Sequence, residues 1–333
     1  MKKYLIALLP TLIMHIGCAL VFPAKLQAQA MSIDGDRALY PLSQAVIASL
    51  RDKMHRSVDV SSAISGTRAG FNKFCRGETD INNSSRPILQ SEMDQCEKFN
   101  VRFIELPIAY DALTVVINSR NDWVDSLSVS ELKRIWEPSA QQRIMTWRHV
   151  RSGWPNRPLR LYAPGRHSRT FEYFTEAIVG KAKSSRMDFA ANNHENILVQ
   201  RVAGDRDALG YLRHAYYSEI QKKLRGAPID NGMGPIMPST HSIEDGTYQP
   251  LARPLFIYVN ENSLDRPPAK LFLTFYLLQA SRLVKQVGDL PLSQRDYDIV
   301  IERFKNRQLG TLFGGKPAAG VNLHELFERG ATP

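Results

Sequence analysis

Four short segments of the sequence combine glycine, hydroxyl side chains and arginine, the residue types that bind oxyanions. They are residues 34–38, 65–70, 82–87 and 164–170. Small residues let an anion approach the backbone, hydroxyls donate hydrogen bonds, and arginine supplies a charged, two-pronged donor. Three of the segments lie between a predicted strand and a predicted helix, where free N–H groups favour an anion. Any one of them could be a simple helix cap, but four together predict a shared oxyanion site.

The sequence lacks the motifs of common enzyme mechanisms. It contains no Walker loop, nucleophile elbow, His-Glu-x-x-His motif or zinc-type set of cysteine and histidine. An exported hydrolase of phosphoesters would need a metal cluster or an activated nucleophile. We therefore expect a binding protein and not an enzyme, with no cofactor and no metal.

The predicted elements that position these segments alternate between strands and helices. We expect strands at 31–34, 58–62, 101–107, 113–118, 159–163 and 253–259, and helices at 41–54, 69–75, 170–179 and 269–287. Such alternation indicates an α/β fold with largely parallel sheets, in which ligands bind at the carboxyl ends of the strands. Residues 148–158 and 230–249 interrupt the alternation, and we expect the second to form a long loop.

Composition and charge indicate a globular, exported chain. Its 333 residues include 43 lysine and arginine against 33 aspartate and glutamate, and 43% are hydrophobic. These values exclude a disordered or multi-span membrane protein and favour an anionic ligand or surface. Lys2 and Lys3, the apolar residues 4–22 and the small-x-small pattern of residues 28–30 predict a signal peptide over residues 1–30, cleaved near Ala30. An uncleaved N-terminal anchor is the alternative.

Cleavage would remove Cys18 and leave two cysteines, Cys75 and Cys96. An even pair in an oxidising compartment favours a disulfide. It would close a loop of about 20 residues and stabilise the fold by about 3 kcal/mol. Two free, buried thiols are the alternative.

Several stretches of the sequence occur in the same order as in a known family. Together they cover nearly the whole mature chain. They include residues 33–35 with 40–41, 65–67, 73–81, 84–88, 108–113, 164–171 and 196–211. In them the sequence resembles the periplasmic phosphate-binding proteins of bacterial ABC transporters, and Cys75 with Cys96 resembles a disulfide of one branch.

The resemblance implies a two-lobed type II periplasmic-binding-protein fold, with hinge crossover strands and a ligand cleft between the lobes. We expect residues 31–112 with 245–333 to form lobe I and residues 113–244 to form lobe II. The first crossover would lie at 108–116, and a second before residues 253–259.

The resemblance also implies which residues meet the ligand. Ser65, Ser168 and Thr170 match hydroxyl residues of the family's anion motifs, and Ser85-Arg86 matches a branch that carries arginine at this place. At the first turn, residues 36–38, the resemblance implies that only the backbone N–H groups bind the ligand. The expected binding residues are Asp36, Arg37, Ala38, Ser65, Ser85, Arg86, Arg166, His167, Ser168, Arg169 and Thr170.

Several positions depart from the family pattern. Asp36, Arg37 and Ala38 stand where hydroxyl residues are usual, and Arg166 and His167 stand where Thr-Asp is usual. Arg68 replaces a small residue, and Arg169 replaces a glycine. The family often uses a carboxylate to accept the proton of hydrogen phosphate, which separates phosphate from sulfate, and Asp36 is the candidate replacement. Either the added arginines point outward and the pocket holds orthophosphate, or some point inward and the ligand is a larger or more charged oxyanion.

The expected function is capture of inorganic phosphate, or a related oxyanion, by a monomeric periplasmic protein that delivers it to an inner-membrane ABC permease. The alternative is a binding or sensing module for a different or larger oxyanion, without a transport role. Nucleic acid is not an expected partner, because the basic residues are spread along the chain and no nucleic-acid motif occurs.

Overall fold

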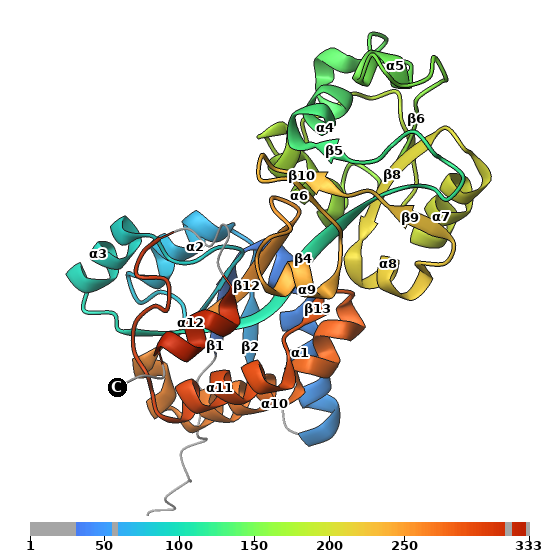
Figure 1. Ribbon diagram of the computed structural model, residues 1–333. Coiled ribbons are helices and arrows are strands. Elements are labelled where there is room, and N and C mark those ends of the chain that lie inside the picture. Colours follow the sequence, from blue (N-terminus) through green and yellow to red (C-terminus); the bar gives the residue numbers. More distant parts are fainter. Residues whose placement is uncertain (1–30, 55–58, 317–321, 331–333) are drawn as a thin grey trace, which may run out of the picture.

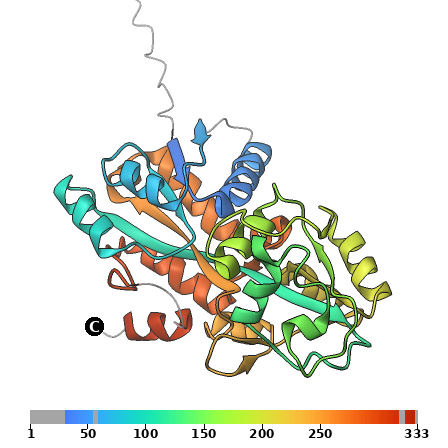
Figure 2. The same ribbon diagram turned by 90° about the horizontal axis from the view of Figure 1, so that it is seen from above.

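The computed structural model describes residues 31–54, 59–316 and 322–330. Its strands and helices form two groups joined by one long strand, β4 (Phe103–Asn118) (Figure 1). Figure 2 shows the two groups side by side from above. The predicted signal peptide lies outside the described residues.

The first group is built on four strands beside β4. β1 (Met31–Gly35) lies between β2 (Val60–Ser62) and β3 (Ile81–Ser84), parallel to both, and β12 (Ala252–Asn260) runs antiparallel to β3. Helices cover both faces, with α10 and α11 on one side and α2 and α3 on the other (Figure 1). These helices and α1 span Tyr40–Met54 (α1), Thr67–Phe74 (α2), Gln90–Lys98 (α3), Pro267–Val287 (α10) and Gln294–Lys305 (α11).

All 16 residues of β4 are buried. Most of them are apolar, but Glu105 and Asp111 are buried in the strand as well. From Phe103 to Ala112 it pairs with β12, and from Leu113 to Ile117 it pairs with β8 (Ala208–Arg213). The predicted crossover at 108–116 therefore lies within β4, where its pairing partner changes.

The second group repeats the strand–helix alternation. β6 (Arg160–Ala163) is parallel to both β8 and β7 (Ala190–Ala191). Its core contains Trp136, Phe174 and Tyr211, and the rings of Phe174 and Tyr211 stack with centroids 3.8 Å apart. The α/β prediction is confirmed. The remaining elements of this group are β5 (Leu127–Ser128), α4 (Val129–Trp136), α5 (Trp147–Val150), α6 (Arg169–Val179), α7 (Glu195–Gly204), α8 (His214–Ile220) and β9 (Leu224–Gly226).

The expectation of a long loop over residues 230–249 is wrong. This stretch contains the end of β10 (Ile229–Asp230), β11 (Pro235–Ile236) and α9 (Thr240–Glu244). Asp230 Oδ1 accepts hydrogen bonds from the N–H groups of Gly232 and Gly234, which forms the turn between the two strands. Ser239 caps α9 by accepting a hydrogen bond from the N–H of Ser242. The glycines and prolines thus form turns between elements too short to show a periodic pattern.

The predicted disulfide is confirmed. Cys75, at the end of α2, is bonded to Cys96 in α3, and both are buried. The bond therefore links α2 and α3, which lie on the same side of the sheet. Among the helices that the structure describes, none is both long and apolar enough to span a bilayer.

Candidate functional site

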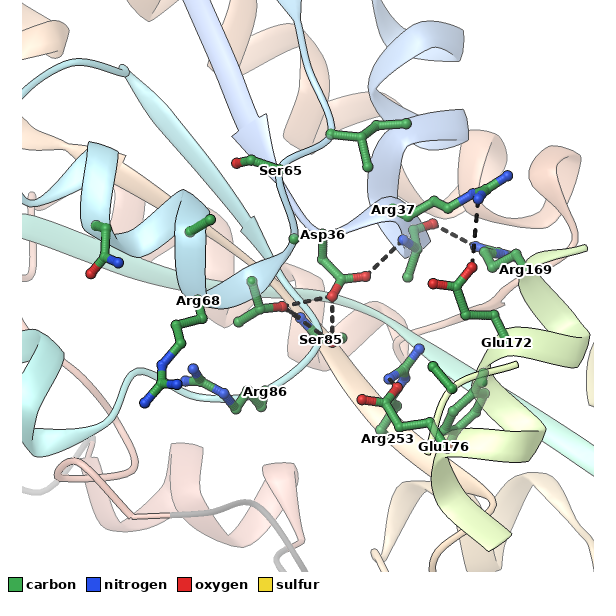
Figure 3. Close-up of a pocket in the computed structure, with 18 residues that line it drawn as sticks. Asp36, Arg37, Ser65, Arg68, Ser85, Arg86, Arg169, Glu172, Glu176 and Arg253 are labelled. Atoms are coloured by element: carbon green, nitrogen blue, oxygen red, sulfur yellow. Dashed lines mark hydrogen bonds and ion pairs between the residues drawn. The ribbon is translucent and has the colours of Figure 1, made fainter. Parts of the chain in front are cut away.

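A cavity of about 790 Å³ lies where the two groups of elements meet. The first group contributes the turn after β1, the start of α2, the loop after β3 and Arg253 of β12, and the second group contributes α6 (Figure 3). Five arginines line it against three carboxylates, so its charge favours an anion. These residues are Arg37, Arg68, Arg86, Arg169 and Arg253 with Asp36, Glu172 and Glu176.

Two glycines allow the parts of this wall to pack closely. Gly35 has a φ of +122°, and a Cβ atom there would lie 2.2 Å from the carbonyl oxygen of Asn83. A Cβ atom on Gly70, in α2, would lie 2.2 Å from Asn82 Oδ1 and 2.7 Å from the Cα atom of Gly35. Any larger residue would push α2 away from β1 and β3. Glycine at both positions therefore brings the turn after β1, the start of α2 and the loop after β3 together.

The Asp36 carboxylate is at the centre of this wall. Its Oδ2 accepts hydrogen bonds from Thr67 Oγ1 at 2.6 Å and Ser85 Oγ at 2.8 Å, and its Oδ1 accepts one from the Ala38 N–H at 2.8 Å. Burial alone would raise the pKa of Asp36, but the Arg253 guanidinium and these hydrogen bonds hold it below its ordinary value. The carboxylate is therefore ionised at neutral pH. A carboxylate has about four acceptor positions, so one remains for a proton donor.

Open hydrogen-bond donors lie beside Asp36 at the start of α2. Gly66 is the N-cap residue and provides no side-chain cap, so the first N–H groups of the helix lack that partner. The N–H of Ser65 is already engaged, because it donates to Asp34 Oδ1 at 2.9 Å, and the Ser65 hydroxyl is buried beside the same carboxylate. Residues 65–69 all line the cavity. A helix start without a side-chain cap favours an anion.

Arg253 is a cavity residue that the sequence did not predict. Its guanidinium lies 3.8 Å from the ring centroid of Tyr173, and its Nη2 is 3.1 Å from Asp111 Oδ2. Its Nε is buried without a hydrogen-bond partner among the described residues. No local pattern marks this arginine, because it stands alone in an apolar strand far from the other segments.

Arg86 lies in the cavity wall, as predicted, but it is also held by a carboxylate. Its Nη1 and Nη2 donate hydrogen bonds to the two oxygens of Glu92 at 2.8 and 2.7 Å. Glu92 is buried in the first turn of α3. The Arg86 charge is therefore partly balanced before any ligand binds.

The structure divides the predicted binding residues between two cavities. Asp36, Arg37, Ala38, Ser65, Ser85, Arg86 and Arg169 line the larger one. His167, Ser168, Arg169 and Thr170 line a neighbouring cavity of about 360 Å³. Ser168 is the N-cap of α6, where its Oγ accepts a hydrogen bond from the Phe171 N–H at 3.1 Å. Arg166 lines neither of these two cavities.

Arg169 lines both cavities and connects the two groups of elements. From the start of α6 it reaches Asp289, which follows α10, with Nη2–Oδ1 and Nη1–Oδ2 distances of 2.6 and 3.1 Å. Its Nη1 also donates a hydrogen bond to the Ala38 carbonyl at 2.5 Å. Asp289 is buried and was not predicted. The Arg169 guanidinium is thus engaged by the protein itself.

Comparisons with known proteins identify relatives of this chain. Residues 23–279 match a family model described as a PBP superfamily domain. Protein SphX of Synechocystis sp. is 42% identical over 326 residues, which cover 98% of this chain and 96% of that protein. The phosphate-binding protein PstS of Staphylococcus saprophyticus is 32% identical over 269 residues, which cover 79% of this chain and 81% of that protein.

Solved structures show the same fold. The crystal structure of a possible phosphate binding protein from Planctomyces limnophilus matches with a TM-score of 0.79 and 38% identity, over 84% of this chain and 98% of that one. PstS from Borrelia burgdorferi matches with a TM-score of 0.60 and 18% identity, over 80% of this chain and 99% of that one, and shows the fold alone.

Proposed function

This chain belongs to the phosphate ABC transporter substrate-binding protein family, with its two-lobed type II periplasmic-binding-protein fold, and from this premise we propose that it captures inorganic phosphate in the larger cavity. The family consists of solute-binding proteins and not of enzymes. The relative from Staphylococcus saprophyticus is named for phosphate binding. One observation supports the proposal for this chain. The ionised carboxylate of Asp36 lies beside open hydrogen-bond donors in a basic cavity.

Hydrogen phosphate fits both kinds of group. Its P–OH can donate to the remaining acceptor position of Asp36, while its other oxygens accept from the N–H groups at the start of α2 and the Arg253 guanidinium. Sulfate is fully ionised at neutral pH and has no proton to donate. One of its oxygens would face the Asp36 carboxylate as a like charge, which is costly in a partly buried site. Asp36 therefore selects phosphate over sulfate.

In this proposal the cavity is the cleft between the lobes, which consist of residues 31–112 with 245–333 and of residues 113–244. Closure of the lobes over phosphate gives an inner-membrane ABC permease a liganded shape to recognise. The protein acts as a monomer in the periplasm, after its signal peptide is cleaved near Ala30.

The binding test is calorimetric titration of the phosphate-free chain from residue 31 with orthophosphate and with sulfate. We expect strong heat from phosphate and little from sulfate. Asp36→Asn should weaken phosphate binding at least tenfold, because a hydrogen bond to a charged group contributes about 1.5–3 kcal/mol. Asp52→Asn, which changes an exposed carboxylate of α1, is the matched control and should bind as the unaltered protein does. Equal responses to the two anions, or none, would contradict the phosphate assignment.

The delivery step needs its own test. Cells that lack this protein should take up labelled phosphate more slowly, and the Asp36→Asn variant should not restore uptake. Normal uptake in cells without the protein, together with intact binding in vitro, would exclude delivery and leave the sensing role.

A further inference from the structure

The loop between β3 and α3, here called the β3 loop, supplies two residues to the wall of the larger cavity. Ser85 donates a hydrogen bond to Asp36 Oδ2 at 2.8 Å, and Arg86 lines the cavity. Further along the loop, Ile88 is fully buried, and its N–H donates to the Tyr258 hydroxyl at 2.8 Å. Tyr258 belongs to β12 and lies outside the cavity lining. The loop is therefore fixed from the protein interior as well as from the cavity side.

Tyr258 connects the β3 loop to the centre of the sheet. It is fully buried, and its hydroxyl, which accepts from the Ile88 N–H, donates to Glu105 Oε2 at 2.6 Å. Glu105 is the residue opposite Tyr258 in β4 and is also fully buried. The Tyr258 ring packs edge-on against Phe71 of α2, with centroids 4.7 Å apart. One buried side chain thus contacts both the β3 loop and α2, which are two elements of the cavity wall.

The Glu105 carboxylate is also held by residues 311–313, which follow α11 and are here called the strap. Thr311 Oγ1 donates to Glu105 Oε2, and the Leu312 N–H donates to Oε1, each at 2.7 Å. Phe313 packs edge-on against a phenylalanine ring of β12, with centroids 5.5 Å apart. A buried carboxylate needs several donors, and the loss of one of them is costly. The strap, Glu105 and Tyr258 therefore form one connected hydrogen-bond network that reaches the β3 loop.

We propose that Tyr258 and the strap position the β3 loop for anion binding through this shared hydrogen-bond network. Tyr258 and Thr311 are then positioning residues, because neither lines the cavity. The inference rests on the proposed function, in which the β3 loop orients Asp36 through Ser85 and adds the charge of Arg86. When the network is broken, the loop opens more often, and a ligand must order it on binding. The hydrogen bond from Ser85 to Asp36 is then weakened, so the preference for phosphate over sulfate falls.

Three substitutions separate positioning from general stability. Tyr258→Phe removes the hydroxyl and keeps the ring against α2, and Thr311→Val removes the hydroxyl of the strap. The matched control is Tyr297→Phe. The Tyr297 hydroxyl, in α11, donates to the Ile108 carbonyl at 2.7 Å in the interior, and neither residue lines the cavity. Each variant loses a buried hydroxyl, so an effect that follows from lower stability alone appears in the control as well.

The first measurement is amide hydrogen exchange, followed by NMR in the ligand-free protein. The reporters are the N–H groups of Ser85 and Leu89, which donate to partners other than Tyr258. We expect Tyr258→Phe to speed their exchange about tenfold and Thr311→Val about threefold, because each lost hydrogen bond makes opening of the loop easier. Tyr297→Phe should leave their exchange unchanged.

The second measurement is calorimetric titration with orthophosphate and with sulfate. Tyr258→Phe should weaken phosphate binding about fivefold, and Thr311→Val should weaken it about twofold, because the ligand must order a looser loop. Both variants should also lower the ratio of phosphate affinity to sulfate affinity. Tyr297→Phe should keep the affinity and the ratio of the unaltered protein.

Three results would each overturn this inference and leave the proposed function standing. They are unchanged exchange of the reporters in Tyr258→Phe, unchanged phosphate affinity despite faster exchange, and an equal effect of Tyr297→Phe on binding. If the unaltered protein does not prefer phosphate while the exchange responds as expected, the proposed function fails, and the network still holds the β3 loop.

Discussion

A buried histidine should make the stability of this protein depend on pH. His214, at the start of α8, is 1% exposed. Its Nδ1 is 2.9 Å from Thr114 Oγ1, and its Nε2 has no hydrogen-bond partner among the described residues. Burial lowers the pKa of His214 from 6.5 to about 4. The folded protein therefore keeps this imidazole neutral over a pH range in which the unfolded chain protonates it.

The sign and size of this pH dependence follow from the difference in proton binding between the unfolded and the folded chain. The contribution of His214 to stability is fully present above pH 6.5 and falls as the pH drops toward 4, because only the unfolded chain gains a proton in that window. At about 1.4 kcal/mol per pH unit, the complete loss is about 3 kcal/mol. This is a large fraction of the typical stability of a folded protein, about 5–15 kcal/mol.

The assay is urea unfolding at pH 7.5, 6, 5 and 4, followed by tryptophan fluorescence. As the pH decreases, the free energy of unfolding should fall more steeply in the unaltered protein than in His214→Leu, because the leucine side chain cannot bind a proton. The slope is compared and not the absolute stability, because the variant changes packing as well. His241→Gln, at a side chain that is 90% exposed, is the control and should keep the original slope. Identical slopes for His214→Leu and the unaltered protein would refute the reasoning.

Three further predictions concern stability. Replacing Cys75 and Cys96 by serine should lower the free energy of unfolding by about 3 kcal/mol and make it insensitive to reductant, as measured by urea unfolding with and without dithiothreitol. Gly288→Ala should cost about 1–3 kcal/mol in the same assay, since its φ is +82° and a Cβ atom would lie 1.8 Å from Arg213 Nη1; an unchanged midpoint would contradict this. Phe174→Ala should cost about 3–5 kcal/mol, because it removes a fully buried ring, and a loss below 1 kcal/mol would show that the core refills the space.

Local signals predicted most of the elements that carry the proposed site. α1 begins at the Tyr40-Pro41 pair, and β4 joins the two strands predicted at 101–107 and 113–118 into one, while its place as the crossover was implied by the family resemblance. β10 and β11 were missed because two-residue strands have no measurable period. Their pairing is set by β5, more than 100 residues earlier, which no local pattern specifies.

The site was predictable only where its residues occur in clusters. Asp36 and Ser85 were found because they belong to glycine- and hydroxyl-rich turns. Arg253 and Asp289 are single charged residues in or beside apolar elements, and only the tertiary structure brings them to the cavities. The Arg86–Glu92 pair was also missed, since it depends on how the loop after β3 folds back onto α3.

The hydrogen bonds of Asp36 have a consequence for the energetics of capture. The Ala38 N–H, the Thr67 hydroxyl and the Ser85 hydroxyl all donate to Asp36 and hold its carboxylate in place without a ligand. The Asp36 side chain is thus fixed in position, and it loses little rotamer entropy when an anion binds. A bound anion must also tolerate the negative charge of the Asp36 carboxylate at close range. In the proposed function, this permanent charge lowers the attainable affinity for every anion and in return separates anions by whether they carry a proton.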